Sequence, residues 1–284
     1  MIGPDRLARV TAAAVVPEQV VAYACAVAGS KPRMFGDCVG YQAGADVVLV
    51  GYPLHDPVDC GAMAAAVDQA LQTPGLERLT VIGPARPPQA PEGSEAACDR
   101  YYALPLPPPA PGSKLRSLLR RAQREVRLER GRRLAPEHAA LVRRYLDERP
   151  LAAGTRQVFS RLGDYLEASA GSLIFSVRRP DGALAAFAVG EFAPLSTAFF
   201  MFCFRDPGRA PPGSADLAVS GLLREAQQRG QSRMNLGLGV SDGVRFFKRK
   251  WGAEPFLPYV ETRWKPSAPG LFARLRGALG RKAR

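Results

Sequence analysis

The chain has 284 residues, 46% of them hydrophobic and 23% charged, which suffices to bury the core of one large domain or of two smaller ones. Lysine and arginine total 39 against 26 acidic residues, and the net charge of +13 favours anionic partners such as tRNA, anionic lipid or a phosphorylated cofactor. The five cysteines lack the close spacing of zinc ligands, so we expect no metal site and no disulfide framework. No window approaches the roughly 18 apolar residues of a membrane span, and the apolar run of residues 10–16 is too short for a signal peptide, so we predict a cytoplasmic protein.

The first third of the sequence predicts a strand, a helix and a strand, after one helix within residues 1–35 that begins at Pro17. Residues 46–52 form an apolar run that a proline ends, as is typical of a buried strand. A helix is predicted over residues 60–71 and a strand over residues 79–83. This alternation indicates an α/β domain.

A proline-rich stretch over residues 84–112 predicts a surface excursion and a stiff linker, with an edge strand at residues 101–104. We therefore expect a domain boundary near Gly112. The predicted units are residues 1–111, residues 112–265 and a basic amphipathic tail, residues 266–284. The tail has an apolar face and a basic face, so it can form a peripheral contact with an anionic membrane, a tRNA contact, or a frayed terminus.

A basic helix is predicted to follow, with Ser113 as its N-terminal cap and leucines at helical spacing. Nine basic residues lie between Lys114 and Arg133, and only Glu125 and Glu129 oppose them. Pairing along a solvated face explains part of this charge, but the excess favours a role in binding an anion. The candidate nucleic-acid-binding residues are Lys114, Arg116, Arg120, Arg121 and Arg124.

The second half predicts helices, three sequential strands, a long helix, and then a strand, a short helix and a strand. The predicted helices cover residues 137–148, 162–168, 215–228 and 244–251, and the predicted strands cover residues 172–177, 183–192, 197–204, 234–238 and 259–264. The continuous aromatic run of residues 197–204 indicates a central strand covered on both faces. Ser241 or Asp242 is expected to cap the last helix and Gly252 to end it. His138, near the first turn of its helix, is expected at the surface.

The end of the chain carries an asparagine and glycines, then a Phe-Lys pair, and then an aromatic residue before a glycine: Asn235, Gly237, Gly239, Phe247, Lys248, Trp251 and Gly252. This order resembles the C-terminal end of GNAT-like acyltransferases, in particular the branch of the FemABX aminoacyltransferases and the C-terminal domains of phosphatidylglycerol lysyltransferases. The resemblance implies an α/β, tandem GNAT-like fold, with a mixed, mostly antiparallel sheet, flanking helices and a degenerate N-terminal copy. Residues 1–111 would then be an N-terminal GNAT-like domain, and residues 112–265 the acyltransferase domain.

In the GNAT fold the acyl donor enters a gap where the central strand splays from its neighbour, and acetyl-CoA users bind pyrophosphate on the loop after that strand. The matching segment, residues 205–221, lacks the expected glycine spacing, and its prolines remove N–H donors. The FemABX and lysyltransferase domains also lack this motif, since their donor is aminoacyl-tRNA. The resemblance therefore implies an aminoacyl-tRNA donor and no tightly bound cofactor, with a coenzyme A thioester as the alternative. The candidate residues for binding donor phosphate on this loop are Arg209, Gly213 and Ser214.

Lys248 is the candidate catalytic residue, because acyl transfer develops negative charge on the carbonyl and leaving oxygens, which a fixed ammonium stabilises. The resemblance supports this role, since family members have a lysine at the matching position close to donor phosphate. Asn235 is a second catalytic candidate that can orient the acceptor amine, and Arg245 can bind phosphate through two hydrogen bonds. The ordinary alternatives are a solvated helix lysine for Lys248 and a turn former for Asn235. No general base is evident, and the candidates are Asp216, Glu191 and Tyr259.

Three functions follow as alternatives from the sequence. The first is transfer of an aminoacyl group from aminoacyl-tRNA to an amine or hydroxyl of a peptide, lipid or metabolite. The second is N-acyl transfer from a coenzyme A or carrier-protein thioester. The third is a non-catalytic GNAT-like module that binds nucleic acid or an anionic membrane.

Overall fold

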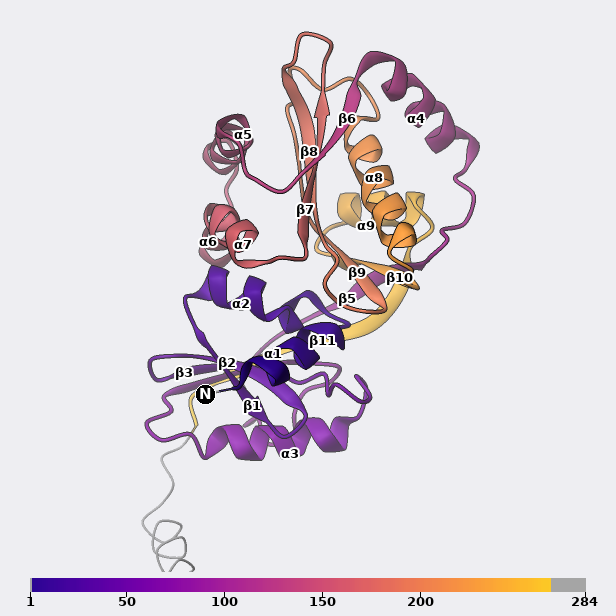
Figure 1. Ribbon diagram of the computed structural model, residues 1–284. Coiled ribbons are helices and arrows are strands. Elements are labelled where there is room, and N and C mark those ends of the chain that lie inside the picture. Colours follow the sequence, from indigo (N-terminus) through magenta and orange to yellow (C-terminus); the bar gives the residue numbers. More distant parts are fainter. Residues whose placement is uncertain (1, 267–284) are drawn as a thin grey trace, which may run out of the picture.

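A computed structural model describes residues 2–266 of the chain, and the predicted tail lies outside them apart from Pro266. The strands form one sheet in the order β1-β2-β3-β4-β11-β5-β10-β9-β8-β7-β6 (Figure 1). They are β1 (Lys31–Phe35), β2 (Cys38–Ala43), β3 (Asp46–Val50), β4 (Arg78–Gly83), β5 (Glu95–Pro105), β6 (Arg127–Gly131), β7 (Ser172–Arg178), β8 (Leu184–Glu191), β9 (Thr197–Arg205), β10 (Arg233–Leu238) and β11 (Glu254–Trp264). The helices are α1 (Pro4–Ala12), the 3-10 helix η1 (Pro17–Gln19), α2 (Val21–Ala28), α3 (Cys60–Leu71), α4 (Ser113–Glu125), α5 (Pro136–Asp147), α6 (Ala153–Ser160), α7 (Leu162–Ala168), α8 (Ser214–Gln228) and α9 (Asp242–Lys250).

The sheet contains the same strand pattern twice. Strands β1, β2 and β3 are antiparallel, and β3 then runs parallel to β4. In the second half β7, β8 and β9 are antiparallel, and β9 runs parallel to β10. Helix α3 connects the first parallel pair and helix α8 the second, as parallel strands require a crossover connection. The mixed, mostly antiparallel sheet with flanking helices and a repeated unit confirms the predicted fold class.

The two halves exchange strands at the centre of the sheet. Strand β11, from the end of the chain, pairs with β4 and β5, and β5 in turn pairs with β10. The predicted boundary at Gly112 falls in the connection between β5 and α4, so the segments on either side of it share one continuous sheet. The hydroxyl of Tyr52 adds to this junction by donating a hydrogen bond of 2.7 Å to the backbone carbonyl of Pro258.

In the N-terminal half the parallel strands stay together to their ends. Strands β3 and β4 pair over five residues, and the Gly51 amide then donates a 2.7 Å hydrogen bond to the Ile82 carbonyl. A Cβ atom built on Gly51 would lie 2.8 Å from Met63 Cγ, and one on Gly83 would lie 2.7 Å from Met63 Sδ. The buried Met63 side chain of α3 therefore fills the space where a gap between these strands would lie, which agrees with a degenerate N-terminal copy.

Helices cover both faces of the C-terminal half of the sheet (Figure 1). Helix α8 packs on strands β7, β8 and β9 of one face, and α4 packs on α8. Helices α5 and α7 pack with strands β7 to β9 on the opposite face, and α2 packs against α7. Strand β9 is thus enclosed from both sides, as its continuous apolar sequence predicts, and its residues from Phe200 to Arg205 also line a cavity.

The first 43 residues differ from their prediction. One helix that begins at Pro17 was expected within residues 1–35, but the structure has α1, the short η1 at Pro17 and α2, followed by the hairpin of β1 and β2. Gly29, with a φ of +60°, ends α2 early and turns the chain into β1. The strands were missed because β1 is mostly half-buried and lacks the clear alternation that marks a strand in sequence.

Three further expectations are wrong. Residues 101–104 belong to β5, which lies between β10 and β11 in the middle of the sheet and not at an edge. The N-terminal cap of α4 is Gly112 and not Ser113, and the helix ends at Glu125 because the following residues pair with β7 as β6. His138 is buried and not at the surface. Both ring nitrogens have partners there: Nδ1 accepts a hydrogen bond from the Ala135 amide, and Nε2 lies 2.8 Å from Ser176 Oγ.

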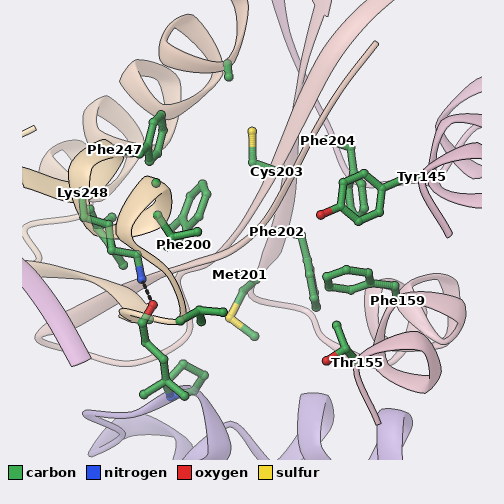
Figure 2. A pocket seen from close by; sticks show the side chains of 18 of the residues that line it. Tyr145, Thr155, Phe159, Phe200, Met201, Phe202, Cys203, Phe204, Phe247 and Lys248 are labelled. Carbon is green, nitrogen blue, oxygen red and sulfur yellow. Dashed lines mark hydrogen bonds between the residues drawn. The ribbon is translucent and has the colours of Figure 1, made fainter. Parts of the chain in front are cut away.

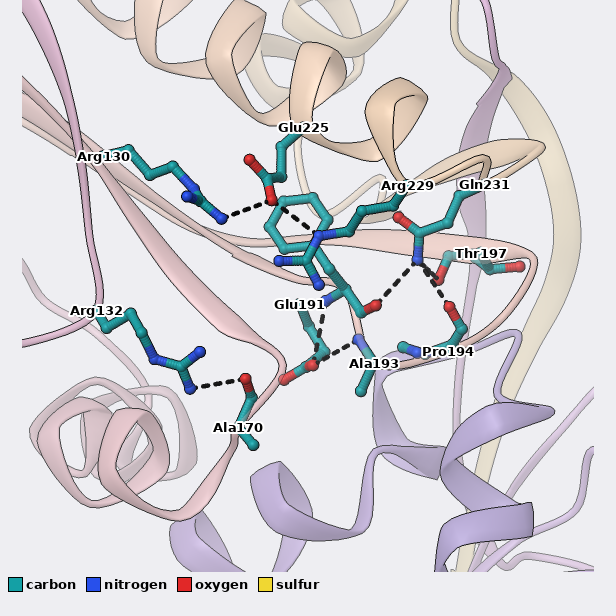
Figure 3. A network of polar contacts seen from close by, with 11 residues as sticks. Arg130, Arg132, Ala170, Glu191, Ala193, Pro194, Thr197, Glu225, Arg229 and Gln231 are labelled. Carbon is teal, nitrogen blue, oxygen red and sulfur yellow. Dashed lines mark hydrogen bonds and ion pairs between the residues drawn. The ribbon is translucent and has the colours of Figure 1, made fainter.

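The buried carboxylate of Glu191 joins strand β8 to helix α7 and to the loop after β8, and Figure 3 shows its bonds to that loop. It accepts hydrogen bonds from the hydroxyls of Tyr165, at 2.8 Å, and Ser169, at 2.5 Å. It also accepts bonds from the amides of Phe192 and Ala193, at 3.1 and 3.0 Å. Four donors satisfy this carboxylate, and it does not line the cavity described below, so its role is structural and not that of a general base.

We expect Glu191→Ala to lower the free energy of unfolding by about 3 kcal/mol, because it leaves several buried donors without an acceptor. Urea denaturation followed by circular dichroism measures this change. Glu167→Ala, at an exposed position of α7, is the control and should stay within about 0.5 kcal/mol of the parent protein. Equal losses for the two variants would contradict the structural role of Glu191.

Candidate active site

The two parallel strands of the C-terminal half separate after a short contact. Strand β10 pairs with β9 only over residues 233–235, opposite residues 197–199, whereas β3 and β4 stay paired over five residues. Gly237 has a φ of +77°, a conformation that favours glycine, and the backbone of β10 turns there. On the side of β8, strand β9 carries one extra residue, Met201, as a bulge. The gap expected beside the central strand is therefore present.

A cavity of about 650 Å³ opens at this gap and reaches both sides of β9 (Figure 2). The Lys248 side, towards α8 and α9, is lined by Phe200, Cys203, Ala215, Val244, Phe247 and Lys248. The Glu18 side, towards η1, α2, α5 and α6, is lined by Glu18, Tyr23, Tyr145, Phe159, Phe202 and Phe204. A single cavity with a cationic group on one side and a carboxylate on the other can hold two reactants around the end of β9.

Local sequence fixes the helix that carries Lys248. The Ser241 hydroxyl caps α9 by accepting a hydrogen bond from the Val244 amide, as predicted. At the other end the amides of Gly252 and Ala253 donate to the carbonyls of Arg249 and Lys248, and Gly252 has a φ of +84°. This is a Schellman motif, which only glycine adopts without cost at that position. Both ends of α9 are thus determined within a dozen residues, and so is the direction of Lys248.

The Lys248 amine is buried at the gap. It donates a hydrogen bond to the carbonyl of Leu238, the last residue of β10, and lies 5.8 Å from the centroid of the Tyr102 ring. Burial disfavours the ammonium form and lowers the pKa of Lys248 to about 7, while the nearby carboxylate of Asp99 acts in the opposite direction. Ammonium and amine forms are therefore both populated near neutral pH, so this group can stabilise negative charge or give up a proton.

Asn235 lies beside the cavity and not in its lining. Its side chain is fully buried, its Nδ2 donates to the Val15 carbonyl at 2.9 Å, and its Oδ1 accepts from the Gly237 amide at 2.8 Å. These bonds hold the turn of β10 and tie it to the segment between α1 and η1. Asn235 positions the backbone whose Leu238 carbonyl holds Lys248, and no free donor or acceptor of its side chain faces an acceptor amine.

None of the four residues predicted to bind donor phosphate lines the cavity. Arg245 pairs with Asp242 at 2.7 Å on the outer side of α9, and the exposed Arg209 lies 3.9 Å from Asp206. Gly213, with a φ of +87°, packs against helix α4, where a Cβ atom would lie 2.7 Å from the Leu118 carbonyl oxygen. The buried Ser214 donates its hydroxyl to the Pro211 carbonyl at 2.7 Å. The next residue of α8, Ala215, does line the cavity, and so does Arg205 before the loop.

The five candidate nucleic-acid-binding residues are exposed on α4. This helix buries Leu115 and Ala122 against the core and keeps its basic residues outside. Only Arg121 among the five has an ion pair in the described residues, with Glu125 at 2.8 Å. None of the five lines the cavity, so they form a separate basic surface next to α8.

Sequence reasoning missed the carboxylate of this site. Glu18, in η1, lines the cavity, and its Oε2 accepts a 2.8 Å hydrogen bond from the Tyr101 hydroxyl. Burial is the main cause that raises the pKa of Glu18, and the charge of Glu261 adds to it. The only local signal was Pro17-Glu18 at a helix start, which is an ordinary position for an acidic residue.

The other titratable candidates have structural partners. Asp216 forms a 2.6 Å ion pair with Lys250, and Tyr259 donates its hydroxyl to Glu261 at 2.7 Å. Burial and that hydrogen bond raise the pKa of Tyr259, so its hydroxyl stays protonated. Burial raises the pKa of the Cys203 thiol to about 12, which makes it a poor nucleophile although it lines the cavity.

Residues 2–266 contain neither a metal-ligand cluster nor a membrane-spanning helix. No group of histidine, cysteine, aspartate and glutamate side chains there is arranged to hold a metal ion. No helix in the same part of the chain has both the length and the apolar character of a bilayer span.

The repeated strand pattern, the gap beside β9 and the cavity define a tandem GNAT-like fold. Three solved structures share this fold. The C-terminal domain of a putative lysylphosphatidylglycerol synthetase from Agrobacterium fabrum has a TM-score of 0.58 and 18% sequence identity, over 96% of this chain and 94% of that chain. FemX has a TM-score of 0.61 and 10% identity, over 92% of this chain and 96% of that chain, and a tandem GNAT protein from the clavulanic acid biosynthesis pathway has a TM-score of 0.53 and 13% identity, over 93% and 95%. No protein-family profile and no curated protein sequence matches the chain. The likeness is one of fold, and at that level it confirms the resemblance to the FemABX and lysyltransferase branch of GNAT-like proteins.

The burial of Lys248 predicts a pH-dependent stability. Because its pKa is lowered in the folded state, the unfolded chain binds an extra proton between pH 7 and the ordinary lysine pKa of about 10.4, and stability rises with pH over that window. We therefore expect Lys248→Met to raise the melting temperature most at pH 6 and to lose this advantage towards pH 10. Thermal denaturation from pH 6 to 10 measures it, with Lys265→Met at an exposed position as the control. A Lys248→Met effect that does not change with pH would contradict the buried amine.

Proposed function

We propose that this chain is an acyltransferase that moves an aminoacyl group from aminoacyl-tRNA to an amine or hydroxyl of a peptide, lipid or metabolite. The observation that carries the proposal is the position of Lys248, whose amine is buried at the gap between β9 and β10 and lines the cavity. The acyl ester of the donor would lie in this gap, with its carbonyl next to Lys248.

Lys248 matches the charge that develops in acyl transfer. Attack on the ester gives a tetrahedral intermediate with negative charge on the carbonyl oxygen, and the ribose oxygen becomes negative as it leaves. An ammonium in a site shielded from water stabilises these charges more than it stabilises the neutral ester. With a pKa of about 7, Lys248 can also supply the proton that the leaving oxygen needs.

Two features support tRNA as the donor. The exposed basic residues of α4 form a surface suited to phosphates, although they lie outside the cavity. The loop before α8 is a poor pyrophosphate site, since the Ser214 hydroxyl is bonded to the Pro211 carbonyl and two adjacent prolines provide no N–H donor. Arg209 and Arg245 remain proposed contacts for donor phosphates, and we propose no tightly bound cofactor.

The alternative donor is a coenzyme A or carrier-protein thioester. The observation that favours it is the first turn of α8, where Ala215 lines the cavity at a helix N-terminus, a position whose free amides can bind phosphate. Binding of tRNA or of anionic vesicles without any acyl transfer would instead indicate a non-catalytic module.

Lys248→Ala is expected to lower the rate of acyl transfer at least 100-fold, because it removes the group that stabilises the transition state. The measurement is single-turnover transfer from a pool of charged tRNA, with hydroxylamine or a mixture of primary amines and alcohols as acceptors. Circular dichroism verifies the fold, and Lys265→Ala is the matched control. Turnover unchanged in the Lys248→Ala variant would remove this residue from the mechanism.

The choice of donor is tested by measuring tRNA and coenzyme A binding side by side at 50 and 200 mM salt. We expect saturable tRNA binding that weakens in the variant with Arg120, Arg121 and Arg124 changed to alanine, with a smaller salt dependence because fewer phosphates are neutralised. The control removes the same charge from exposed sites elsewhere: Arg9, Lys31 and Arg143. Coenzyme A binding without tRNA binding would favour the thioester donor, and equal losses in both triple variants would contradict a specific role for α4.

A further inference from the structure

The Glu18 side of the cavity has features that the donor does not account for. Its carboxylate comes from η1, in the N-terminal half of the chain, and meets a cavity built mainly by the C-terminal half. Among the described residues Glu18 has no ion pair, and the Tyr101 hydroxyl is its hydrogen-bonding side-chain partner. A carboxylate that lines a cavity without a cationic partner is a site for a cation, because its charge is otherwise uncompensated.

The groups around Glu18 are mostly phenols. Tyr41 donates its hydroxyl to the Glu18 backbone carbonyl at 2.7 Å, and Tyr101 packs edge-on against Tyr52 and Tyr259 at 5.9 and 5.7 Å. Burial raises the pKa of each of these hydroxyls, so they stay neutral and cannot neutralise the carboxylate. Glu261 repels it, and the cationic residues that line the cavity are Lys248, Arg205 and Arg149. None of the three forms an ion pair with Glu18, and the Arg149 guanidinium lies over the Tyr145 ring, 4.4 Å from its centroid.

A row of aromatic rings lines the Glu18 side of the cavity, and Figure 2 shows four of them, Phe202, Phe159, Phe204 and Tyr145. Tyr23 lies 6.2 Å from Phe202, and Phe202 lies 5.8 Å from Phe159. Phe159 in turn contacts Phe204 at 5.3 Å and Tyr145 at 5.8 Å. Aromatic faces favour both apolar groups and cations, so this lining suits an apolar or aromatic frame that ends in an ammonium.

We propose that the Glu18 side binds the acyl acceptor as a primary amine on an apolar or aromatic frame, with Glu18 accepting the proton of the attacking nitrogen. This inference rests on the proposed acyl transfer and narrows its acceptor from an amine or hydroxyl to an amine. The rings of Tyr145, Phe159, Phe202 and Phe204 hold the frame, and the Tyr101 hydroxyl positions the Glu18 carboxylate.

The bound ammonium first loses one proton to solvent by way of Glu18, which leaves a neutral amine facing the acyl carbonyl. A C–N bond then forms, the nitrogen passes a second proton to Glu18, and the bond from the acyl carbon to the leaving oxygen or sulfur breaks. The leaving atom takes a proton from the Lys248 ammonium, and exchange with solvent returns the proton of Glu18 to Lys248.

The test uses two probes of the same shape, 2-phenylethylamine and 2-phenylethanol, with the full chain and calorimetry at pH 7.5. We expect the amine to bind at least 10-fold more tightly than the alcohol, and Glu18→Gln to remove this preference while circular dichroism stays unchanged. The amine should also bind more weakly as the pH falls through the pKa of Glu18, and the Glu18→Gln variant should lack this dependence. Phe159→Ala should weaken both probes, and Glu167→Gln, at an exposed position, should change neither.

Equal binding of the two probes to the parent protein, or an amine preference that survives Glu18→Gln, would overturn the inference. Transfer to 2-phenylethylamine from charged tRNA or an acyl thioester is the second measurement, and Glu18→Gln should lower its rate at least 100-fold and flatten its acidic limb against pH. Transfer that Glu18→Gln leaves unchanged also overturns the inference. Selective amine binding without transfer from either donor overturns the proposed function instead, so the two failures are distinguishable.

Discussion

The separation of β9 from β10 is the constraint on which the rest of the site depends. Two parallel strands that stay hydrogen-bonded leave no room for a ligand, as Met63 and the continuous pairing of β3 and β4 illustrate. In the second half the pairing stops at Asn235, whose side chain takes over the hydrogen bonds that hold the backbone in place. The backbone that follows no longer pairs with β9, although Leu238 still pairs with Tyr101 of β5, and the Leu238 carbonyl accepts a hydrogen bond from the amine of Lys248. The separation of β10 from β9 thus accounts both for the cavity and for the position of Lys248 in it.

The parts of the site that sequence could predict are those that local chemistry determines. The cap at Ser241 and the C-terminal glycine at Gly252 lie close to Lys248, so their spacing gives the helix and its place in the terminal motif. The spacing of apolar residues in the same way predicts helix α3, the hairpin of β7 and β8, and strand β9. Only one part of the role of Asn235 could be predicted, its place as a turn former. Its hydrogen bond to the Val15 carbonyl could not be predicted, because it joins residues 220 positions apart.

Glu18 and the place of β5 could not be predicted, because both depend on pairing between distant segments. Strand β5 contains a proline-flanked stretch with exposed residues at its start, which is typical of an edge. It lies inside the sheet because β11 and β10 cover its two sides, and neither strand is near it in sequence. Tyr101 of β5 then meets Glu18 at a separation of 83 residues, so the carboxylate has no local mark of its function. The N-terminal half has no gap of its own and instead contributes this carboxylate to the cavity of the second half.

The insertion of β11 between β4 and β5 has a consequence for the synthesis of the protein. When the ribosome has made the first 111 residues, β4 and β5 exist but their shared neighbour does not, because it begins at Glu254. Both strands expose backbone amides and carbonyls to other chains during that time, a condition that promotes aggregation. The sheet can close only after β11 has emerged, so folding of the first half waits for the synthesis of residues 254–264. A truncated chain that stops before β11 would therefore lose order in both halves, and not only at its C-terminus.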